Sequence, residues 1–186
     1  MVYYDIIDDY VSKNSQFILL NLFESDTIPW YYNSFTTPSK ESGQRYQYTN
    51  TFIRDGHYCQ SNEDINYLKQ LLPFPEWETH KCWRIKFNLT NPYKHRKLMK
   101  PHVDIDPSIS GVVYLYYVND SDGDTKLYPN INKNYSYKWW KFWDCVRVKP
   151  KQGRVVRMST DLWHSGNNPY FYDRRIVGNF VFIDTP

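Results

Sequence analysis

Short segments in which apolar and polar residues alternate recur along the chain, most densely after residue 75, and this pattern is typical of β-strands. In residues 83–89 (WRIKFNL) the pattern has a period of two, which predicts a strand with one buried face. Residues 111–118 (GVVYLYYV) are almost continuously apolar and aromatic, as expected of a strand covered on both faces. The same reasoning predicts strands over residues 30–32, 146–148, 154–158 and 176–183.

Two helices are expected in the first part of the chain. Ser61 and Asp64 form a capping box ahead of a stripe of apolar residues at helical spacing, and Pro73 ends this helix. Residues 15–24 also have helical spacing, with Ser15 as a plausible N-cap. The apolar run 17–20 within them is equally compatible with a short buried strand, so both interpretations stay open.

Helices early and strands later predict a mainly β (α+β) fold, a sandwich or barrel with N-terminal helices packed on one side. Neither a repeat nor a linker divides the sequence, so residues 1–186 are expected to form a single domain. We assign helical support and a lid to residues 1–75 and the β-core to residues 76–186. The lid itself is expected within residues 34–60, whose first part is polar and rich in Ser, Thr and Gln.

Composition narrows the class of protein. A chain of 186 residues with 41% hydrophobic and 19% aromatic residues is long enough for a real core and favours sheets over helices. It contains neither an apolar run long enough to span a membrane nor a basic N-terminal region typical of a secretory signal, so we expect a cytoplasmic protein. Three widely spaced cysteines argue against a disulfide framework.

Charge gives only weak hints about partners. The net charge of +3 does not mark a nucleic-acid-binding protein. A basic run at residues 94–100 would suit an anionic substrate, although such runs are usually solvated loops. Residues 135–143 interleave aromatic residues with lysines, which fits either a strand with one packed face or a stacking platform for single-stranded nucleic acid. Nucleic acid therefore stays a weakly supported partner.

The sequence PHVDID at residues 101–106 holds the first candidate chemistry. On an extended strand His102 and Asp104 project to the same face, and two such ligands need one more to form the facial triad of non-haem iron enzymes. His164 lies close to a predicted strand and is the obvious second imidazole. Asp106 shares the face of Asp104, so it is a rival ligand, a residue that supports the ligands from behind, or a residue that faces the substrate.

With these residues in place, the sequence resembles the Fe(II)- and 2-oxoglutarate-dependent dioxygenases, in particular the prolyl-4-hydroxylase-like branch and its small bacteriophage-encoded members. The resemblance runs from about Trp83 to Phe182. It is carried, in family order, by the stretches PHVDID, GVVYLYYVNDSDGDTKLY, KPKQGRVVRMSTDLWHSG and RRIVGNFVF. It implies a double-stranded β-helix (jelly-roll) core, and His102, Asp104 and His164 as the catalytic iron ligands.

The same resemblance implies that 2-oxoglutarate chelates the iron while an arginine binds its far carboxylate. Arg175 fits the family's terminal strand better, whereas spacing from the histidine favours Arg174. Where the family often has Ser or Thr, this chain has Val177, and the lost hydroxyl would shift part of the anchoring to other side chains. The candidates are Arg84, Asn88, Tyr114 and Tyr116, of which Asn88 and Tyr116 are taken as cofactor-binding.

The implied reaction is hydroxylation of an unactivated C–H bond, coupled to decarboxylation of 2-oxoglutarate to succinate and CO2, with O2 as oxidant and ascorbate as reductant. The candidate substrates are a prolyl peptide, another protein side chain, a nucleic acid base and a small molecule. Two other classes compete, a non-catalytic jelly-roll binding module or virion component and a zinc hydrolase. The zinc hydrolase is disfavoured because neither an HExxH helix nor an evident general base accompanies the ligands.

Overall fold

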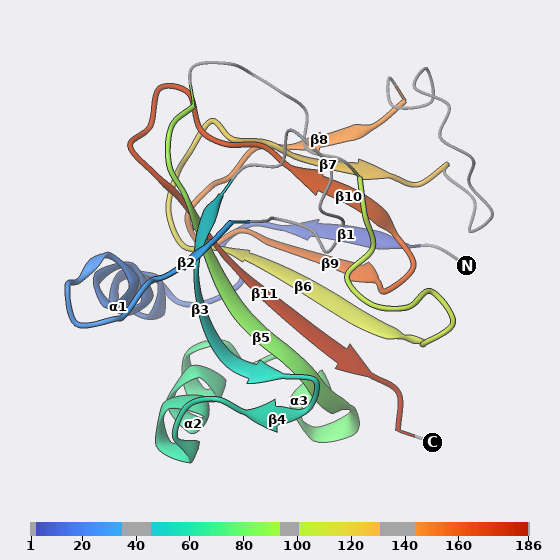
Figure 1. The fold of residues 1–186 in the computed structure, drawn as a ribbon. Coiled ribbons are helices and arrows are strands. Elements are labelled where there is room, and N and C mark those ends of the chain that lie inside the picture. The colour runs from blue at the N-terminus through green and yellow to red at the C-terminus, as the bar shows by residue number, and fades with distance from the viewer. Residues whose placement is uncertain (1–2, 35–45, 94–100, 131–143, 186) are drawn as a thin grey trace.

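The computed structural model describes residues 3–34, 46–93, 101–130 and 144–185, and these form two antiparallel sheets with three helices (Figure 1). In chain order the elements are β1 (Tyr4–Ile7), α1 (Lys13–Glu24), β2 (Tyr31–Asn33), β3 (Gln47–Arg54), β4 (His57–Tyr58), α2 (Asn62–Leu71), α3 (Glu76–Thr79), β5 (Lys81–Thr90), β6 (Gly111–Tyr117), β7 (Thr125–Tyr128), β8 (Val146–Val148), β9 (Val155–Ser159), β10 (Trp163–Gly166) and β11 (Arg175–Ile183).

The larger sheet has the strand order β1-β9-β6-β11-β5-β3-β2, with β4 paired to β3, and the smaller sheet has the order β10-β7-β8. Every pairing between these strands is antiparallel. In Figure 1 the smaller sheet lies on one side of the larger sheet, while α1, α2 and α3 lie on the other side. The mainly β fold with N-terminal helices on one side is thus confirmed, as a sandwich rather than a closed barrel.

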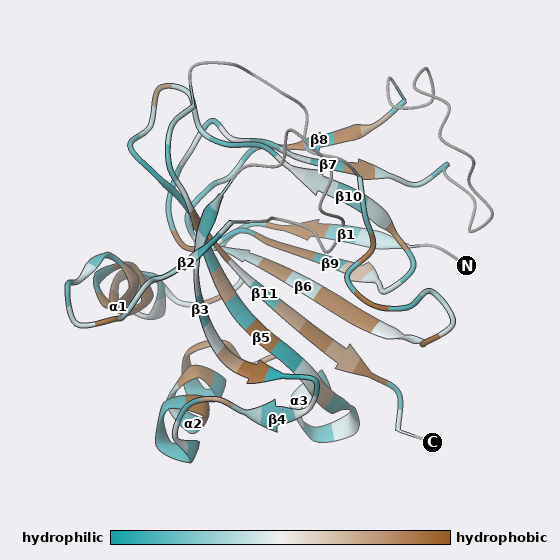
Figure 2. Cartoon of the chain, in the orientation of Figure 1, coloured by the Kyte–Doolittle hydropathy of each residue, from teal (hydrophilic) through white to brown (hydrophobic). Residues whose placement is uncertain are grey.

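The side chains of β5 and β11 alternate between two environments. Ile85, Phe87 and Phe180 are fully buried among apolar residues of α1 and α2, whereas Arg84 and Arg175 point to the opposite face of the sheet. Figure 2 shows this alternation as brown and teal bands along β5. Because successive residues of a strand point to opposite faces, each strand serves the core and the inner face at once.

The capping of α2 is as predicted. The Ser61 hydroxyl accepts a hydrogen bond from the Asp64 backbone N–H at 3.1 Å and donates one to the Asp64 carboxylate at 2.6 Å. Helix α1 confirms the helical interpretation of residues 15–24 over the strand, but its N-cap is Ser12 rather than Ser15. Ser12 accepts from the Ser15 backbone N–H at 3.1 Å, so the helix begins one turn earlier than the sequence suggested.

Part of the segment expected to form the lid belongs to the large sheet instead. Residues 47–54 form β3, an inner strand of the large sheet that pairs with both β5 and β2, and residues 57–58 form β4. Residues 35–45 lie outside the described residues. The first 75 residues therefore contribute strands β1 to β4 as well as helices. Among the described residues, no helix is long and apolar enough to cross a membrane.

Candidate metal centre

His102 and His164 are brought together by their own backbones. The His102 N–H donates to the His164 carbonyl and the His164 N–H donates to the His102 carbonyl, each at 2.9 Å. This is the hydrogen-bonded type of antiparallel pair, in which the two side chains stand next to each other on the same face. Their ring centroids lie 4.7 Å apart. The extended strand expected over residues 102–106 is wrong, because in the described part of the chain His102 forms an isolated bridge rather than a strand and Asp104 lies in a bend.

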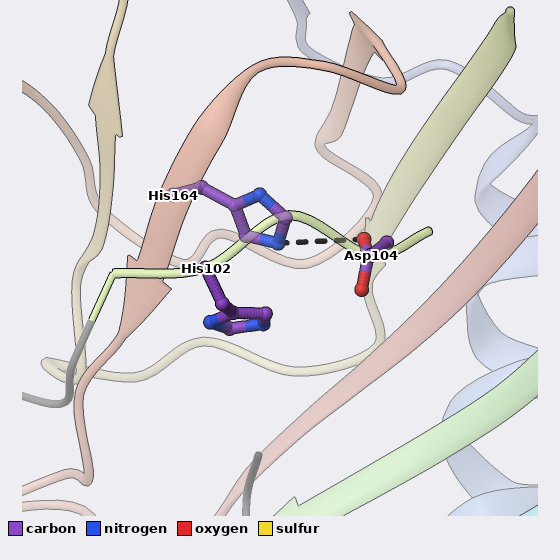
Figure 3. Close-up of side chains that lie close together, drawn as sticks. All are labelled: His102, Asp104 and His164. Atoms are coloured by element: carbon purple, nitrogen blue, oxygen red, sulfur yellow. Dashed lines mark ion pairs between the residues drawn. The ribbon is translucent and has the colours of Figure 1, made fainter. Parts of the chain in front are cut away.

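Asp104 completes a cluster with the two histidines (Figure 3). One potential ligand atom from each of the three residues lies within 4.8 Å of the others. The His164 Nε2 atom is 3.4 Å from the Asp104 Oδ2 atom, and both side chains are more than nine-tenths buried. Two imidazole nitrogens and one carboxylate oxygen converge here, as expected from the sequence for these three residues.

The carboxylate of Asp104 is held by Arg84 of β5 and Asn179 of β11. Arg84 donates from Nη2 to Asp104 Oδ1 at 2.6 Å and from Nη1 to the Asp104 carbonyl at 3.1 Å. Asn179 donates from Nδ2 to Asp104 Oδ2 at 2.9 Å, and its Oδ1 accepts in turn from Arg84. Two neighbouring strands thus fix an aspartate that lies outside any strand, and side chains in such positions orient metal ligands.

The electrostatics of the cluster favour an ionised carboxylate. Burial by itself would raise the pKa of Asp104, but the Arg84 guanidinium and then His164 hold this pKa well below its usual value. Burial would lower the pKa of His164, whereas the Asp104 carboxylate outweighs it and raises that pKa. A dication would provide the counter-charge that His164 provides when it is protonated.

The tautomer of His164 follows from its remaining contact. Its Nδ1 atom lies 3.1 Å from the Leu162 carbonyl oxygen, which can only accept, so Nδ1 carries the proton. The lone pair of Nε2 is then directed toward the cluster. Metal-binding histidines are commonly oriented in this way.

Asp106 does not reach the cluster. Its Oδ1 atom accepts from the Ser108 backbone N–H at 2.8 Å and from the Ser108 hydroxyl at 2.7 Å, and the residue is exposed. These bonds lower the pKa of Asp106 and close the turn that leads into β6. The chain bends at Asp104, so Asp104 and Asp106 do not share a face as they would on an extended strand. Asp106 is therefore a turn residue and not a ligand.

A cavity of about 80 Å³ lies between the two sheets beside the cluster. It is lined by His102, Asp104, His164, Gln47, Lys86, Asn88, Thr90, Leu115, Thr125, Gly166, Arg175, Val177 and Asn179. The lining is polar at the positions contributed by β5, and at Arg175 and Asn179 of β11, and the candidate metal ligands occupy one part of it.

Arg175 lines the same cavity and is 7% exposed. Its Nη2 atom donates to the Thr125 hydroxyl at 2.7 Å, and within the described residues its buried Nε has no hydrogen-bond partner. Tyr117 also donates to the Thr125 hydroxyl, at 2.7 Å. A hydroxyl has two acceptor lone pairs and one O–H, so Thr125 keeps its own proton for a further acceptor. Gly166 leaves room for the guanidinium, since a Cβ there would lie 3.3 Å from Nη1.

The other anchoring candidates divide between the cavity and elsewhere. Asn88 lines the cavity, and its buried Oδ1 has no partner among the described residues. Arg174 is exposed and outside the cavity, with its carbonyl accepting from Asn119. Tyr116 and Tyr114 point to the helix-covered face, where Tyr114 bonds to Glu76. The prediction that Tyr116 binds the cofactor is therefore wrong, because the even-numbered residues of β6 point away from the cavity.

Several cavity residues were not recognised in the sequence. Thr125 directly follows Asp124 at the start of β7, and Asn179 lies four residues after Arg175 on the same face of β11. Lys86 shares the inner face of β5 with Arg84 and Asn88, and the period of two alone could have indicated it. The basic run at 94–100 and the aromatic run at 135–143 lie outside the described residues.

Comparisons with known proteins identify the fold. Neither a family model nor a curated protein matches the sequence. Among solved structures, HygX from Streptomyces hygroscopicus, with nickel, 2-oxoglutarate and hygromycin B bound, has a TM-score of 0.67 at 12% identity, covering 99% of this chain and 84% of that one.

Two prolyl hydroxylases are also similar. The Trichoplax adhaerens enzyme, in complex with a peptide of the hypoxia inducible factor, has a TM-score of 0.62 at 16% identity, covering 97% of this chain and 83% of that one. The Pseudomonas putida prolyl-4-hydroxylase has a TM-score of 0.61 at 13% identity, covering 98% and 93%. The chain has the jelly-roll fold of these proteins. Identities this low establish the fold and leave the activity to be argued from the site.

Proposed function

We propose that the chain is an Fe(II)- and 2-oxoglutarate-dependent dioxygenase that hydroxylates an unactivated C–H bond. The observation that carries this proposal is a single cavity with His102, Asp104 and His164 in one part and the buried, incompletely bonded Arg175 in another. The fold likeness to 2-oxoglutarate oxygenases supports it. A non-catalytic binding module would not need to keep a buried charge and buried ligands together.

The donor set fits iron. Two imidazoles and one carboxylate on one side of a metal leave open positions, and this set is diagnostic of non-haem Fe(II) oxygenases. The carboxylate is ionised and oriented by Arg84 and Asn179, and the His164 Nε2 lone pair faces it. His102, Asp104 and His164 would hold the metal, with Arg84 of β5 and Asn179 of β11 keeping the Asp104 carboxylate in place.

The far part of the cavity fits the distal carboxylate of 2-oxoglutarate. Arg175 has a free Nε–H, and Thr125 has a free O–H once both its lone pairs are taken by Arg175 and Tyr117. A carboxylate accepting from both would satisfy donors that are otherwise buried without partners. Thr125 would thus replace the hydroxyl that is missing at Val177, and Asn88 would supply a further polar contact.

When bound, iron would activate O2 as the oxidant, 2-oxoglutarate would supply two of the electrons as it is converted to succinate and CO2, and ascorbate would keep the metal reduced. The chain's own contribution is positional. Arg84 and Asn179 hold the carboxylate ligand, and Arg175 with Thr125 fixes the co-substrate. The apolar side chains Leu115 and Val177 keep water from part of the cavity wall.

We propose a peptide or protein side chain such as proline, or a small molecule, as the substrate. The Trichoplax structure contains a peptide fragment and the HygX structure contains hygromycin B, so this fold accommodates both kinds of ligand. We also propose that the chain is related to the small bacteriophage-encoded dioxygenases. The same proposal places it in the cytoplasm, which is the host cytoplasm if a phage encodes it.

Release of succinate tests the proposal. Purified protein with Fe(II), ascorbate, O2 and 2-oxoglutarate should form succinate slowly even without substrate, and a chelator or His164→Ala should abolish it. His57→Ala, which changes an exposed histidine of β4, is the matched control and should keep the rate. If the folded protein binds neither Fe(II) nor 2-oxoglutarate at millimolar concentration, the oxygenase proposal fails and the binding-module interpretation replaces it.

A further inference from the structure

Lys86 is a cation of the cavity that the proposed reaction does not use. It stands on the inner face of β5 between Arg84 and Asn88, and it is half-buried. Arg84 is engaged by Asp104 and Asn179. No hydrogen bond or ion pair joins Lys86 to another described residue, although its side chain lines the cavity. An ammonium group in such a place is unfavourable unless an anion accompanies it.

The position of Lys86 separates it from the anchor for the distal carboxylate. In the β5–β11 register Lys86 lies opposite Asn179, whereas Arg175 lies opposite Thr90. Lys86 and Arg175 are therefore four residues apart along the strand direction, which corresponds to roughly 13 Å. Along the strands Lys86 lies at the same height as the candidate metal ligands, because its partner in the register, Asn179, bonds to Asp104.

The charges of the cavity leave Lys86 without a partner. Asp104 is the one acidic residue among the described lining residues, and it already binds Arg84. With a metal dication and the 2-oxoglutarate dianion in place, the metal, Arg84, Lys86 and Arg175 would still exceed the negative charge by two. Burial, and then the repulsion of Arg84, lowers the pKa of Lys86 to about 8, while Asp104 opposes this only in part.

We propose that Lys86 binds an oxyanion of the substrate, a carboxylate or a phosphate, at the metal level of the cavity. This inference rests on the proposed function for its biological meaning and deepens it by naming the chemical class of the substrate. A lysine suits the role because it acts as a point charge toward either kind of oxyanion.

Binding of two probe anions tests the inference. Protein loaded with Ni(II) and saturated with 2-oxoglutarate is titrated calorimetrically with acetate and, separately, with methyl phosphate. We expect one probe to bind at a single site and Lys86→Met to weaken it by roughly tenfold or more, because a charge-assisted bond is lost. Lys86→Arg should keep affinity within about threefold of wild type. Lys81→Met changes an exposed lysine of the same strand and should have no effect.

The choice of probe identifies the substrate class, since preference for acetate points to a carboxylate and preference for methyl phosphate to a phosphate ester. The inference is overturned if neither probe binds, or if binding survives in Lys86→Met. It is also overturned if Lys86→Met weakens 2-oxoglutarate as strongly as Arg175→Met does, because Lys86 would then belong to the co-substrate. If wild type binds neither Ni(II) nor 2-oxoglutarate, the proposed function fails, and the same titrations of metal-free protein still decide the role of Lys86.

Discussion

The two faces of the large sheet are made by the same strands and have opposite characters. On the helix-covered face Phe87 and Phe180 are completely buried, and the Phe87 ring stacks on Phe23 of α1 at 3.7 Å between centroids. On the inner face Lys86 and Arg175 line a cavity, and Arg84 bonds to Asp104 beside it. The first face mainly buries apolar area, together with the Glu76–Arg157 ion pair and, among the described residues, an unpaired Tyr116 hydroxyl, whereas the second gathers cations around a polar cavity.

This contrast indicates where stability and function reside. A face that only needed to be stable would not place two cations and an unpaired asparagine in a cavity, since each burial costs free energy. The inner face is expected to recover that free energy when a metal and anions bind. Changes to the two faces should therefore have different, and in one case opposite, effects on stability.

The largest expected effect is at the candidate metal ligand. Asp104→Ala should remove metal binding and turnover together, because one of three ligands is lost and Arg84 is left beside the site without its carboxylate. Asp106→Ala, which changes an exposed turn residue, should retain both. Equilibrium dialysis with Fe(II) or Ni(II) measures the difference. The reverse result, with Asp106→Ala losing the metal, would show that the wrong carboxylate was chosen.

The second effect belongs to the helix-covered face. Phe87→Ala should lower the free energy of unfolding by about 3–5 kcal/mol, because it leaves a cavity among packed rings. Phe171→Ala, at an aromatic residue that is 78% exposed, should change it by less than about 0.5 kcal/mol. Urea unfolding gives both values. Under native conditions Phe87→Ala should still bind metal, and a loss of metal binding from the folded variant would contradict the division between the faces.

The third effect separates the two arginines. Arg175→Met should weaken 2-oxoglutarate by roughly a hundredfold while sparing the metal, since a buried bidentate partner for a carboxylate is removed. Arg174→Met should leave both affinities unchanged because Arg174 is exposed. Calorimetry on Ni(II)-loaded protein compares the variants. An effect at Arg174 instead would move the anchor by one residue and out of the described cavity.

The smallest effect has the opposite sign. Lys86 has a folded-state pKa of about 8, below its unfolded value, so the folded state binds fewer protons and stability should rise between about pH 8 and pH 10. At pH 7 the buried ammonium should cost about 1–3 kcal/mol once solvent screening is included. Lys86→Met should therefore stabilise metal-free protein at pH 7, with the difference vanishing near pH 10. Thermal unfolding measures this, and destabilisation at pH 7 would contradict it.

Local signals predicted much of the helix-covered face. The capping box at Ser61, the alternation in residues 83–89 and the apolar run at 111–118 depend on neighbours in the sequence, and each appears in the structure as expected. By contrast β1 and β3 were not predicted as strands. Their sequences lack a clear period of two or are rich in polar residues, and they become strands by pairing with β9 and β5.

The candidate site was predictable in its residue types and less so in its geometry. His102, Asp104 and His164 were found from spacing and resemblance, and they do lie together. Their geometry depends on contacts between residues far apart in sequence, such as the bond from Arg84 to Asn179. Nothing in residues 101–106 indicates that Asp104 lies in a bend. The role of Thr125 beside Arg175 likewise depends on how β7 approaches β11, which no local pattern reports.

The most direct test of the central claim is anaerobic titration of the protein with Fe(II) and 2-oxoglutarate, followed by visible absorption. If one cavity holds both, their complex should give a weak metal-to-ligand charge-transfer band that saturates at one equivalent of each. The band should be absent in His164→Ala. In Arg175→Met it should require roughly a hundredfold more 2-oxoglutarate. Folded protein that gives no band at millimolar concentrations of both would contradict the account.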